Sequence, residues 1–174
     1  KGQKRLSERL ARVRDGELSG ARIRVHGDFH LGQVLHTGKD FVILDFEGEP
    51  ARGKSHRRGR RSPFADVAGM LRSFHYAAHA GMQDERISVV RGADRTQLID
   101  WAEVWQKWVS ARYLSGYLTQ MDATGLLPSD QSDRELLLET YVIEKALYEL
   151  AYELDNRPGW VGTPLKGLLS ILGL

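Results

Sequence analysis

Two short segments of this chain hold side chains that could together transfer a phosphoryl group. Asp28 lies in a glycine-containing turn after a β-like segment, and Gln33 follows it by five positions. Asp45 comes at the end of the apolar run at residues 41–44. Phosphoryl transfer to a hydroxyl needs a carboxylate that orients and deprotonates the hydroxyl, and oxygen ligands for Mg²⁺ on the nucleotide phosphates. These three side chains supply such groups.

Each carboxylate alone has a simpler interpretation. Asp28 could be an ordinary turn residue, and Asp45 could cap the end of a strand. Their joint spacing favours chemistry, because protein kinases carry H-x-D-x-x-x-x-N and D-F-G in two segments joined by a β-hairpin. Residues 26–33 have that spacing, with Gln33 in the place of the usual Asn, and Asp-Phe-Glu stands at 45–47. The kinase interpretation is therefore favoured.

The stretch from residue 22 to about residue 78 resembles the catalytic lobe of bacterial maltokinases, in the aminoglycoside-phosphotransferase-like branch of the protein-kinase superfamily. Four segments carry the resemblance: HGDFHLGQVL at 26–35, DFEGEP at 45–50, RSP leading into DVAGMLRS at 61–73, and YELAYELDNRP at 148–158. Gln33 together with DFEGEP is its sharpest marker, since other sugar kinases share only the looser pattern.

The resemblance implies a role for each residue of the two motifs. Asp28 would be the general base for the sugar hydroxyl, while Gln33 and Asp45 would ligate Mg²⁺ on ATP. Glutamine reaches one methylene further than asparagine, so we expect a slightly reshaped metal site. Glu47 would add a metal or water contact, although a solvated loop acid explains it equally well.

Three further residues are expected to support the catalytic loop. His26 would hold the loop through a backbone hydrogen bond, and His30 would do the same or line the substrate side. Asp66 lies in the first turn of a predicted helix, where the helix dipole favours an acid. In kinase-like folds an Asp at this place also braces the catalytic loop.

The C-terminal segment at 148–160 is the best candidate for the sugar-acceptor site. Its spacing lets several polar side chains share one helical face. Without the resemblance, a solvated face would be the simpler interpretation. Trp160 follows in a Pro-Gly loop and could stack on a sugar or pack between the last two helices. The predicted substrate-binding residues are His30, Tyr148, Glu149, Tyr152, Glu153, Asn156, Arg157 and Trp160.

The elements that must position these residues are mostly helices. Short strands are expected at 22–25 and 32–35, and the apolar run at 41–44 predicts a buried strand paired with the second of them. A turn is expected at 37–40. Helices are expected at 4–14, 64–80, about 95–121, about 132–155 and after Thr163, from apolar periodicity and capping signals. The capping signals are Ser62-Pro63, Asp94 with Gln97, and Ser132 with Glu135; Gly81 is expected to end the second helix, and 82–92 to connect it to the third. This order predicts an α+β fold, mostly helical, of the type found in the C-terminal lobe of protein-kinase-like proteins.

Two other features are explained most simply by packing or by solvation. Trp101, Trp105 and Trp108 fall on one helical face with Leu98, which predicts a core stripe. The segment 48–61 is rich in Gly and Arg and predicts a long, solvated surface loop, although some arginines could approach phosphate or a partner domain. It has no interleaved aromatic residues for stacking on bases.

Composition narrows the class of protein. The chain has 174 residues, no cysteine and a formal net charge of +2. Thiol catalysis and Cys-ligated zinc are therefore excluded, and a nucleic-acid partner is not indicated. No apolar run approaches the ~20 residues of a membrane helix, so we expect a cytoplasmic protein. The Gly-rich loop and strand Lys of a nucleotide lobe are not found either, so residues 1–174 are interpreted as a single C-terminal catalytic lobe.

The resulting hypothesis is an ATP-dependent kinase that converts maltose to maltose 1-phosphate, in trehalose and glycogen metabolism. Its partners would be the sugar, an N-terminal nucleotide lobe of the same parent protein and a trehalose synthase domain. The lobe alone is expected to be inactive. Two alternatives stay open: a kinase of another sugar such as glucosamine, and a non-catalytic kinase-like scaffold domain.

Overall fold

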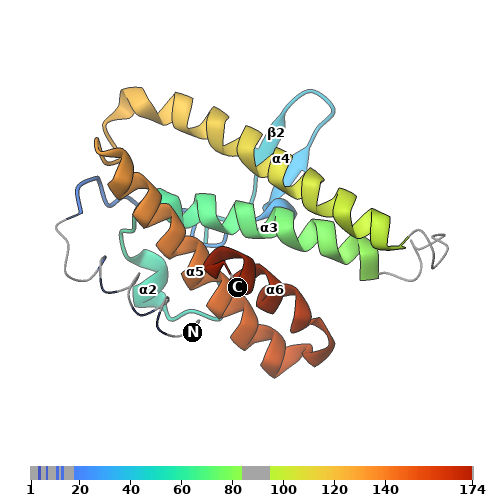
Figure 1. The fold of residues 1–174 in the computed structure, drawn as a ribbon. Helices are drawn as coiled ribbons and strands as arrows, with labels where there is room; N and C mark the ends of the chain where they lie inside the picture. The colour runs from blue at the N-terminus through green and yellow to red at the C-terminus, as the bar shows by residue number, and fades with distance from the viewer. Residues whose placement is uncertain are drawn as a thin grey trace.

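The described part of the chain folds into a mostly helical α+β structure with one β-hairpin, as the sequence predicts (Figure 1). The computed structural model describes residues 18–83 and 95–173, together with Lys4, Ser7, Ala11 and Val13. These four residues are helical, in agreement with the helix expected at 4–14. The rest of that helix, the predicted connector at 82–92 beyond Gln83, and the predicted cap Asp94 lie outside the described residues.

Helix α3 (Phe64–Gln83) forms the centre of the molecule. It packs between α4 (Arg95–Met121) and α5 (Gln131–Asn156), and α6 (Gly162–Leu172) packs on α5 (Figure 1). Short 3₁₀ turns, η3 (Asp122–Thr124) and η4 (Pro158–Trp160), connect α4 to α5 and α5 to α6. The predicted helices are thus present, with α3 extending past Gly81 by two residues.

Capping residues explain where the long helices begin. The Ser62 hydroxyl accepts from the Phe64 amide at 3.4 Å, and Pro63 follows it as the sequence predicts. At α5 the cap is Asp130 rather than Ser132, because the Asp130 carboxylate accepts from the amides of Ser132 and Asp133. Helix α5 therefore starts slightly earlier than the capping-box pattern predicts.

Two apolar clusters hold the helices together. One joins α3 to α4 and the start of α5 through Phe64, Val67 and Leu127. The other joins α5 to α6 through Ile143, Ala146, Leu168 and Leu172. Both clusters lie among the helices, so the catalytic segments at 22–49 are positioned by contacts with α3 and α5 rather than by a sheet.

The hairpin consists of β1 (Val34–His36) and β2 (Phe41–Ile43), with Val34 opposite Ile43. The turn at 37–40 is present, but Leu31–Gln33 forms the 3₁₀ turn η1, so β1 begins two residues later than predicted. The strand expected at 22–25 is reduced to one bridge between Ile23 and Arg61.

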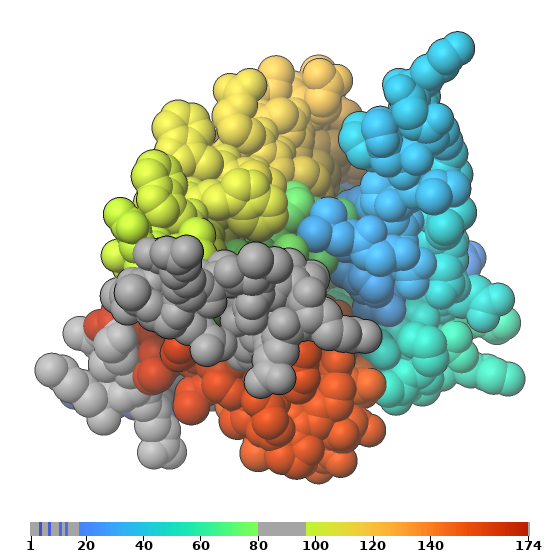
Figure 2. Space-filling model, turned by 90° about the vertical axis from the view of Figure 1, so that its right-hand side faces the viewer, coloured from blue at the N-terminus to red at the C-terminus, as the bar shows by residue number. Residues whose placement is uncertain are grey.

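Two predictions of burial are wrong. Phe41 is 66% exposed and residues 42–44 exceed 40% exposure, so the apolar run is not a buried strand. Trp101 and Trp108 are 64% and 67% exposed, so the tryptophan stripe on α4 is not core. The physical reason is the same in both cases, since no described element packs over these side chains. Figure 2 shows the hairpin (blue) projecting beyond the helices.

The basic segment is also more ordered than predicted. It contains the short helix α2 (Lys54–Arg58). Arg52 and Arg61 both form ion pairs with Glu144 on α5, so they are not simply solvated. Glu144 therefore ties this segment to the helix that carries the predicted acceptor residues.

Candidate active site

The catalytic loop at 26–33 is anchored on α3 by one carboxylate. Asp66 accepts hydrogen bonds from the backbone amides of His26, at 2.7 Å, and Gly27, at 2.9 Å. An ideal Cβ at Gly69 would lie 2.5 Å from the Phe29 carbonyl oxygen, so only glycine lets the loop come this close to the helix. Asp66 and Gly69 thus fix the height of the loop above α3.

The buried ring of His26 connects the loop to the hairpin. Its Nδ1 accepts from the Asp28 amide at 3.3 Å, and its Nε2 lies 2.6 Å from the Leu44 carbonyl oxygen. The tautomer with its proton on Nε2 satisfies both contacts. The ring also packs against Phe46, with centroids 4.9 Å apart. His26 therefore joins the two motif segments through the backbone hydrogen bonds that the sequence predicts.

The carboxylate of Asp28 lies between two nitrogen groups. Lys145 Nζ donates to Oδ1 at 3.4 Å, and His30 Nε2 lies 3.7 Å from Oδ2. His30 Nδ1 accepts from the Gly32 amide, which leaves Nε2–H directed at Asp28. Burial raises the pKa of Asp28, but His30 and Lys145 together outweigh it and hold that pKa below its usual value. Asp28 is thus ionised at neutral pH.

The predicted metal ligands Gln33 and Asp45 are brought together. Gln33 Nε2 donates to Asp45 Oδ2 at 3.3 Å, so the amide oxygen and the carboxylate lie close to each other. Asp45 has a φ of 55°, a left-handed conformation that it alone adopts among the described non-glycine residues. Glu47 is exposed, and its backbone oxygen, rather than its carboxylate, accepts from Arg57.

This donor set fits Mg²⁺ in a nucleotide site. Magnesium is usually held by one or two carboxylates, with substrate phosphates and water completing the octahedron. Within the described residues, no group of three or more His, Cys, Asp or Glu side chains is arranged to hold a metal ion. Gln33 and Asp45 could hold Mg²⁺ together with the phosphates of a bound nucleotide.

A cavity of about 360 Å³ opens beside Asp28. Its floor comes from α3 and its wall from α5, and it is large enough for a small ligand. The lining includes His30 and five of the predicted acceptor residues from the C-terminal segment. These five are Tyr148, Glu149, Tyr152, Glu153 and Arg157. Asn156 and Trp160 do not line it: Asn156 bonds back to the Tyr152 carbonyl, and Trp160 packs under the Arg157 guanidinium.

Two acids of the cavity wall already have partners in α3 or their own helix. Arg72, which is 3% exposed, donates to Glu149 at 2.8 Å. Burial raises the pKa of Glu149, although the Arg72 ion pair opposes the shift. Glu153 accepts from Tyr76 at 3.2 Å and from Arg157 at 2.6 Å. These pairs fix the wall, and they explain why α3 and α5 stay in register.

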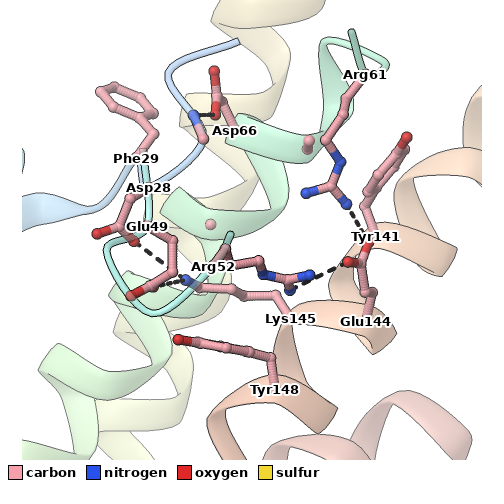
Figure 3. A pocket seen from close by; sticks show the side chains of 13 residues that line it. Asp28, Phe29, Glu49, Arg52, Arg61, Asp66, Tyr141, Glu144, Lys145 and Tyr148 are labelled. Atoms are coloured by element: carbon pink, nitrogen blue, oxygen red, sulfur yellow. Dashed lines mark hydrogen bonds and ion pairs between the residues drawn. The ribbon is translucent and has the colours of Figure 1, made fainter. Parts of the chain in front are cut away.

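A closer view of the space behind Asp28 shows residues that sequence reasoning missed (Figure 3). Lys145 points from α5 toward Asp28 and Glu49, and its ammonium lies 3.8 Å from the Glu49 carboxylate. The buried Tyr148 hydroxyl points the same way, and burial beside Glu49 raises its pKa to about 12. Lys145 precedes Glu149 by one helical turn, so spacing places it near the acceptor face but does not indicate its contact with Asp28.

Taken together, the site can place a hydroxyl-bearing ligand beside an ionised carboxylate. Asp28 opens onto the cavity, and Gln33 and Asp45, from the two motif segments, are hydrogen-bonded to each other. Such an arrangement suits proton acceptance from a hydroxyl next to a metal-bound phosphate.

No helix in the described part of the chain is both long and apolar enough to cross a membrane.

The chain is similar to known sugar kinases. It is 31% identical to a glucosamine kinase of Streptacidiphilus jiangxiensis over 153 residues, which are 86% of this chain and 32% of that protein. It is 25% identical to a glucosamine kinase of Mycolicibacterium smegmatis, over 90% of this chain and 36% of the relative. The chain thus spans about a third of the length of these curated relatives. No protein-family model matches it.

Solved structures agree with this likeness. A glucosamine kinase in complex with glucosamine, ADP and inorganic phosphate superposes with a TM-score of 0.71 and 26% identity, over 97% of this chain and 37% of that one. A second crystal form of a glucosamine kinase gives a TM-score of 0.73 over 98% of this chain and 38% of its own. The homologues of this chain are therefore sugar kinases with the same mostly helical fold, and they are described as glucosamine kinases rather than maltokinases.

Proposed function

We propose that the protein phosphorylates a sugar hydroxyl with ATP, and that this chain forms its C-terminal catalytic lobe. The observation that carries the proposal is the position of Asp28, an ionised carboxylate at the edge of a cavity lined by polar side chains. The kinase-like spacing of Asp28, Gln33 and Asp45 and the sugar-kinase relatives support it.

In the proposed reaction the acceptor hydroxyl occupies the cavity beside Asp28. Asp28 accepts the hydroxyl proton as the oxygen bonds to the γ-phosphorus of ATP, and the bond to the departing ADP oxygen breaks. Gln33 and Asp45 would hold Mg²⁺, which offsets the charge of the phosphates. His30 Nε2 lies 3.7 Å from the second oxygen of Asp28 and lines the same cavity, so it faces the acceptor hydroxyl together with Asp28.

Glucosamine is the acceptor that we favour. Both named relatives are glucosamine kinases, and one solved neighbour binds glucosamine with ADP. The charges of the cavity also suit an amino sugar. Arg72 neutralises Glu149, and Arg157 neutralises Glu153. Among the described lining residues, this leaves one cation, Lys145, facing two carboxylates, those of Asp28 and Glu49. One negative charge is left over, and it would attract an ammonium group.

Maltose is the second candidate acceptor. Its support is the resemblance of segments 26–35 and 45–50 to maltokinases. The two acceptors differ in charge, so the leftover negative charge of the cavity separates them: it attracts the ammonium of glucosamine and does nothing for neutral maltose. A trehalose synthase partner rests on the same resemblance alone.

The exposed hairpin supports a second lobe. Leu35, Phe41 and Phe46 are at least half exposed, and their apolar faces need a cover. A nucleotide-binding lobe of the parent protein, seated over the hairpin and the Gln33–Asp45 pair, would bury them. The isolated lobe is then expected to have little or no activity.

The test is phosphorylation by the full-length parent with ATP and Mg²⁺, read out by product mass. Glucosamine, maltose and a panel of neutral sugars are supplied separately. A phosphorylated amino sugar that disappears with Asp28→Asn is the expected result. Phosphorylated maltose alone would keep the reaction and overturn the preferred acceptor. A folded parent that binds nucleotide but modifies no sugar would favour the scaffold alternative.

A further inference from the structure

One cation outside the two kinase motifs reaches the catalytic carboxylate. Lys145 belongs to α5, and its side chain is about three-quarters buried. Its ammonium contacts Asp28 Oδ1 at 3.4 Å and Glu49 Oε2 at 3.8 Å (Figure 3). It also lines both the acceptor cavity and the smaller space behind it. Lys145 therefore joins the acceptor helix to the two motif segments at the reacting end of the site.

The neighbouring contacts show that packing does not require this lysine. Glu144, the preceding residue, already ties α5 to the basic segment through Arg52 and Arg61. Arg72 and Glu149 tie the same helix to α3 one turn later. Lys145 belongs to neither apolar cluster. Its ammonium also lies over the face of the Tyr148 ring, 5.2 Å from the ring centroid.

We propose that Lys145 is a positioning residue for the proton-accepting step: it holds Asp28 by Oδ1 and Glu49 beside it, so that Oδ2 is presented to the acceptor hydroxyl. Two carboxylates close together repel each other in a partly buried site, and a shared ammonium removes that repulsion. The inference rests on the proposed function, because it assigns Lys145 a part in the same reaction.

Several titratable groups face Asp28, and they come from three segments of the chain. His30 comes from the catalytic loop, Glu49 from the segment before α2, and Lys145 with Tyr148 from α5. Asp66 on α3 is occupied by the backbone amides of His26 and Gly27. Among the described residues, Lys145 is thus the only lysine or arginine in direct contact with Asp28. No neighbour on α5 can take over this contact when Lys145 is replaced.

The experiment uses the full-length parent with three variants at this position and one control. Lys145→Met and Lys145→Gln remove the charge, and Lys145→Arg keeps it. Lys107→Met removes an exposed lysine from α4 as the matched control. Two readouts are taken: kcat and KM for glucosamine across pH, and the ¹³C titration of the Asp28 carboxyl without substrate or metal. Circular dichroism checks the fold of every variant.

We expect the neutral variants to lose kcat by about 100-fold, because a small misplacement of a catalytic group has that effect. The midpoint of the Asp28 titration should rise, and the acidic limb of kcat/KM should move to higher pH with it. Lys145→Arg should recover much of both, and Lys107→Met should resemble wild type. Unchanged kcat, or an unchanged Asp28 midpoint, in both neutral variants would overturn the inference.

Failure of the proposed function would look different. If the wild-type parent phosphorylates no sugar, the proposed reaction is wrong, and the carboxyl titration alone then decides whether Lys145 controls Asp28. If the parent is active and the neutral variants retain full activity, the reaction stands and the role of Lys145 falls.

Discussion

The catalytic loop at 26–33 and the hairpin that follows it adjoin in the chain, yet they are held in different ways. The loop is fixed by polar contacts: Asp66 binds its backbone, and the His26 ring bridges to Leu44. The hairpin turns Phe41 and Val42 outward with no described element over them. Polar groups are therefore buried and partnered where chemistry is proposed, whereas apolar groups are exposed beside it.

The two regions therefore differ in whether their side chains find partners within the described residues. Around the loop, Asp28 is paired with Lys145 of α5, and Asp66 of α3 accepts from two backbone amides. The hairpin's apolar side chains have no described element over them, which leaves them available to the second lobe proposed above.

The largest effect is expected from the base itself. Asp28→Asn in the full-length parent should lower kcat by at least about 10²–10⁴-fold, because the amide cannot accept the hydroxyl proton. The fold should be intact, since the Asp28 backbone contacts do not involve the carboxylate. Steady-state kinetics with glucosamine measure the loss, and Asp40→Asn in the exposed turn is the control. A rate within a few-fold of wild type would remove Asp28 from the mechanism.

Arg72 is the next residue to change. Arg72→Met should destabilise the chain by about 3–5 kcal/mol at neutral pH, because it leaves Glu149 buried without its cation. The pKa of Glu149 is already raised by burial, and losing Arg72 should raise it further.

The pH dependence gives this variant a signature. An acid whose folded-state pKa is raised destabilises the fold as the pH rises through that pKa. The loss of stability in Arg72→Met should therefore be largest at neutral pH and shrink as the pH falls, once Glu149 takes up a proton. Urea unfolding at several pH values measures it. A loss that does not depend on pH would mean that packing at Gly167, which lies against the Arg72 guanidinium, matters more than charge.

Much of this polar region could be predicted from the sequence, because motif spacing and local capping are properties of neighbouring residues. The pairing of Gln33 with Asp45 and the start of α3 after Ser62 follow from such signals. Lys145 could not be assigned in this way, since its contact with Asp28 spans 117 positions and depends on how α5 lies over the loop.

The exposed tryptophans show the opposite limit. The spacing of Trp101, Trp105 and Trp108 does place them on one face of α4, as predicted. Periodicity identifies a shared face but not the element that covers it, so the inference from an apolar stripe to a core position was wrong. The same reasoning failed for the apolar run that became β2.

The anchor of the catalytic loop gives the third prediction. Asp66→Ala should destabilise the chain by roughly 2–4 kcal/mol, because two backbone amides lose a charged acceptor. Asp66→Asn retains one acceptor oxygen and should lose less. Chemical denaturation of both variants, with Asp155→Ala at an exposed position of α5 as control, measures the difference. Equal stability of Asp66→Ala and wild type would show that Gly69 packing alone holds the loop.

The smallest effect should come from the hairpin. Phe41→Ser should change the unfolding free energy of this chain by less than about 1 kcal/mol, because the side chain is 66% exposed and little buried area is lost. The buried Phe64→Ser is the matched comparison and should cost several times more. The same Phe41 variant in the full-length parent should be clearly more destabilising if a second lobe covers the hairpin, since the apolar ring would then leave a packed interface. Thermal unfolding of both lengths measures the two effects. An identical, small loss in each would mean that the hairpin faces solvent in the parent as well, and that its apolar side chains need another explanation.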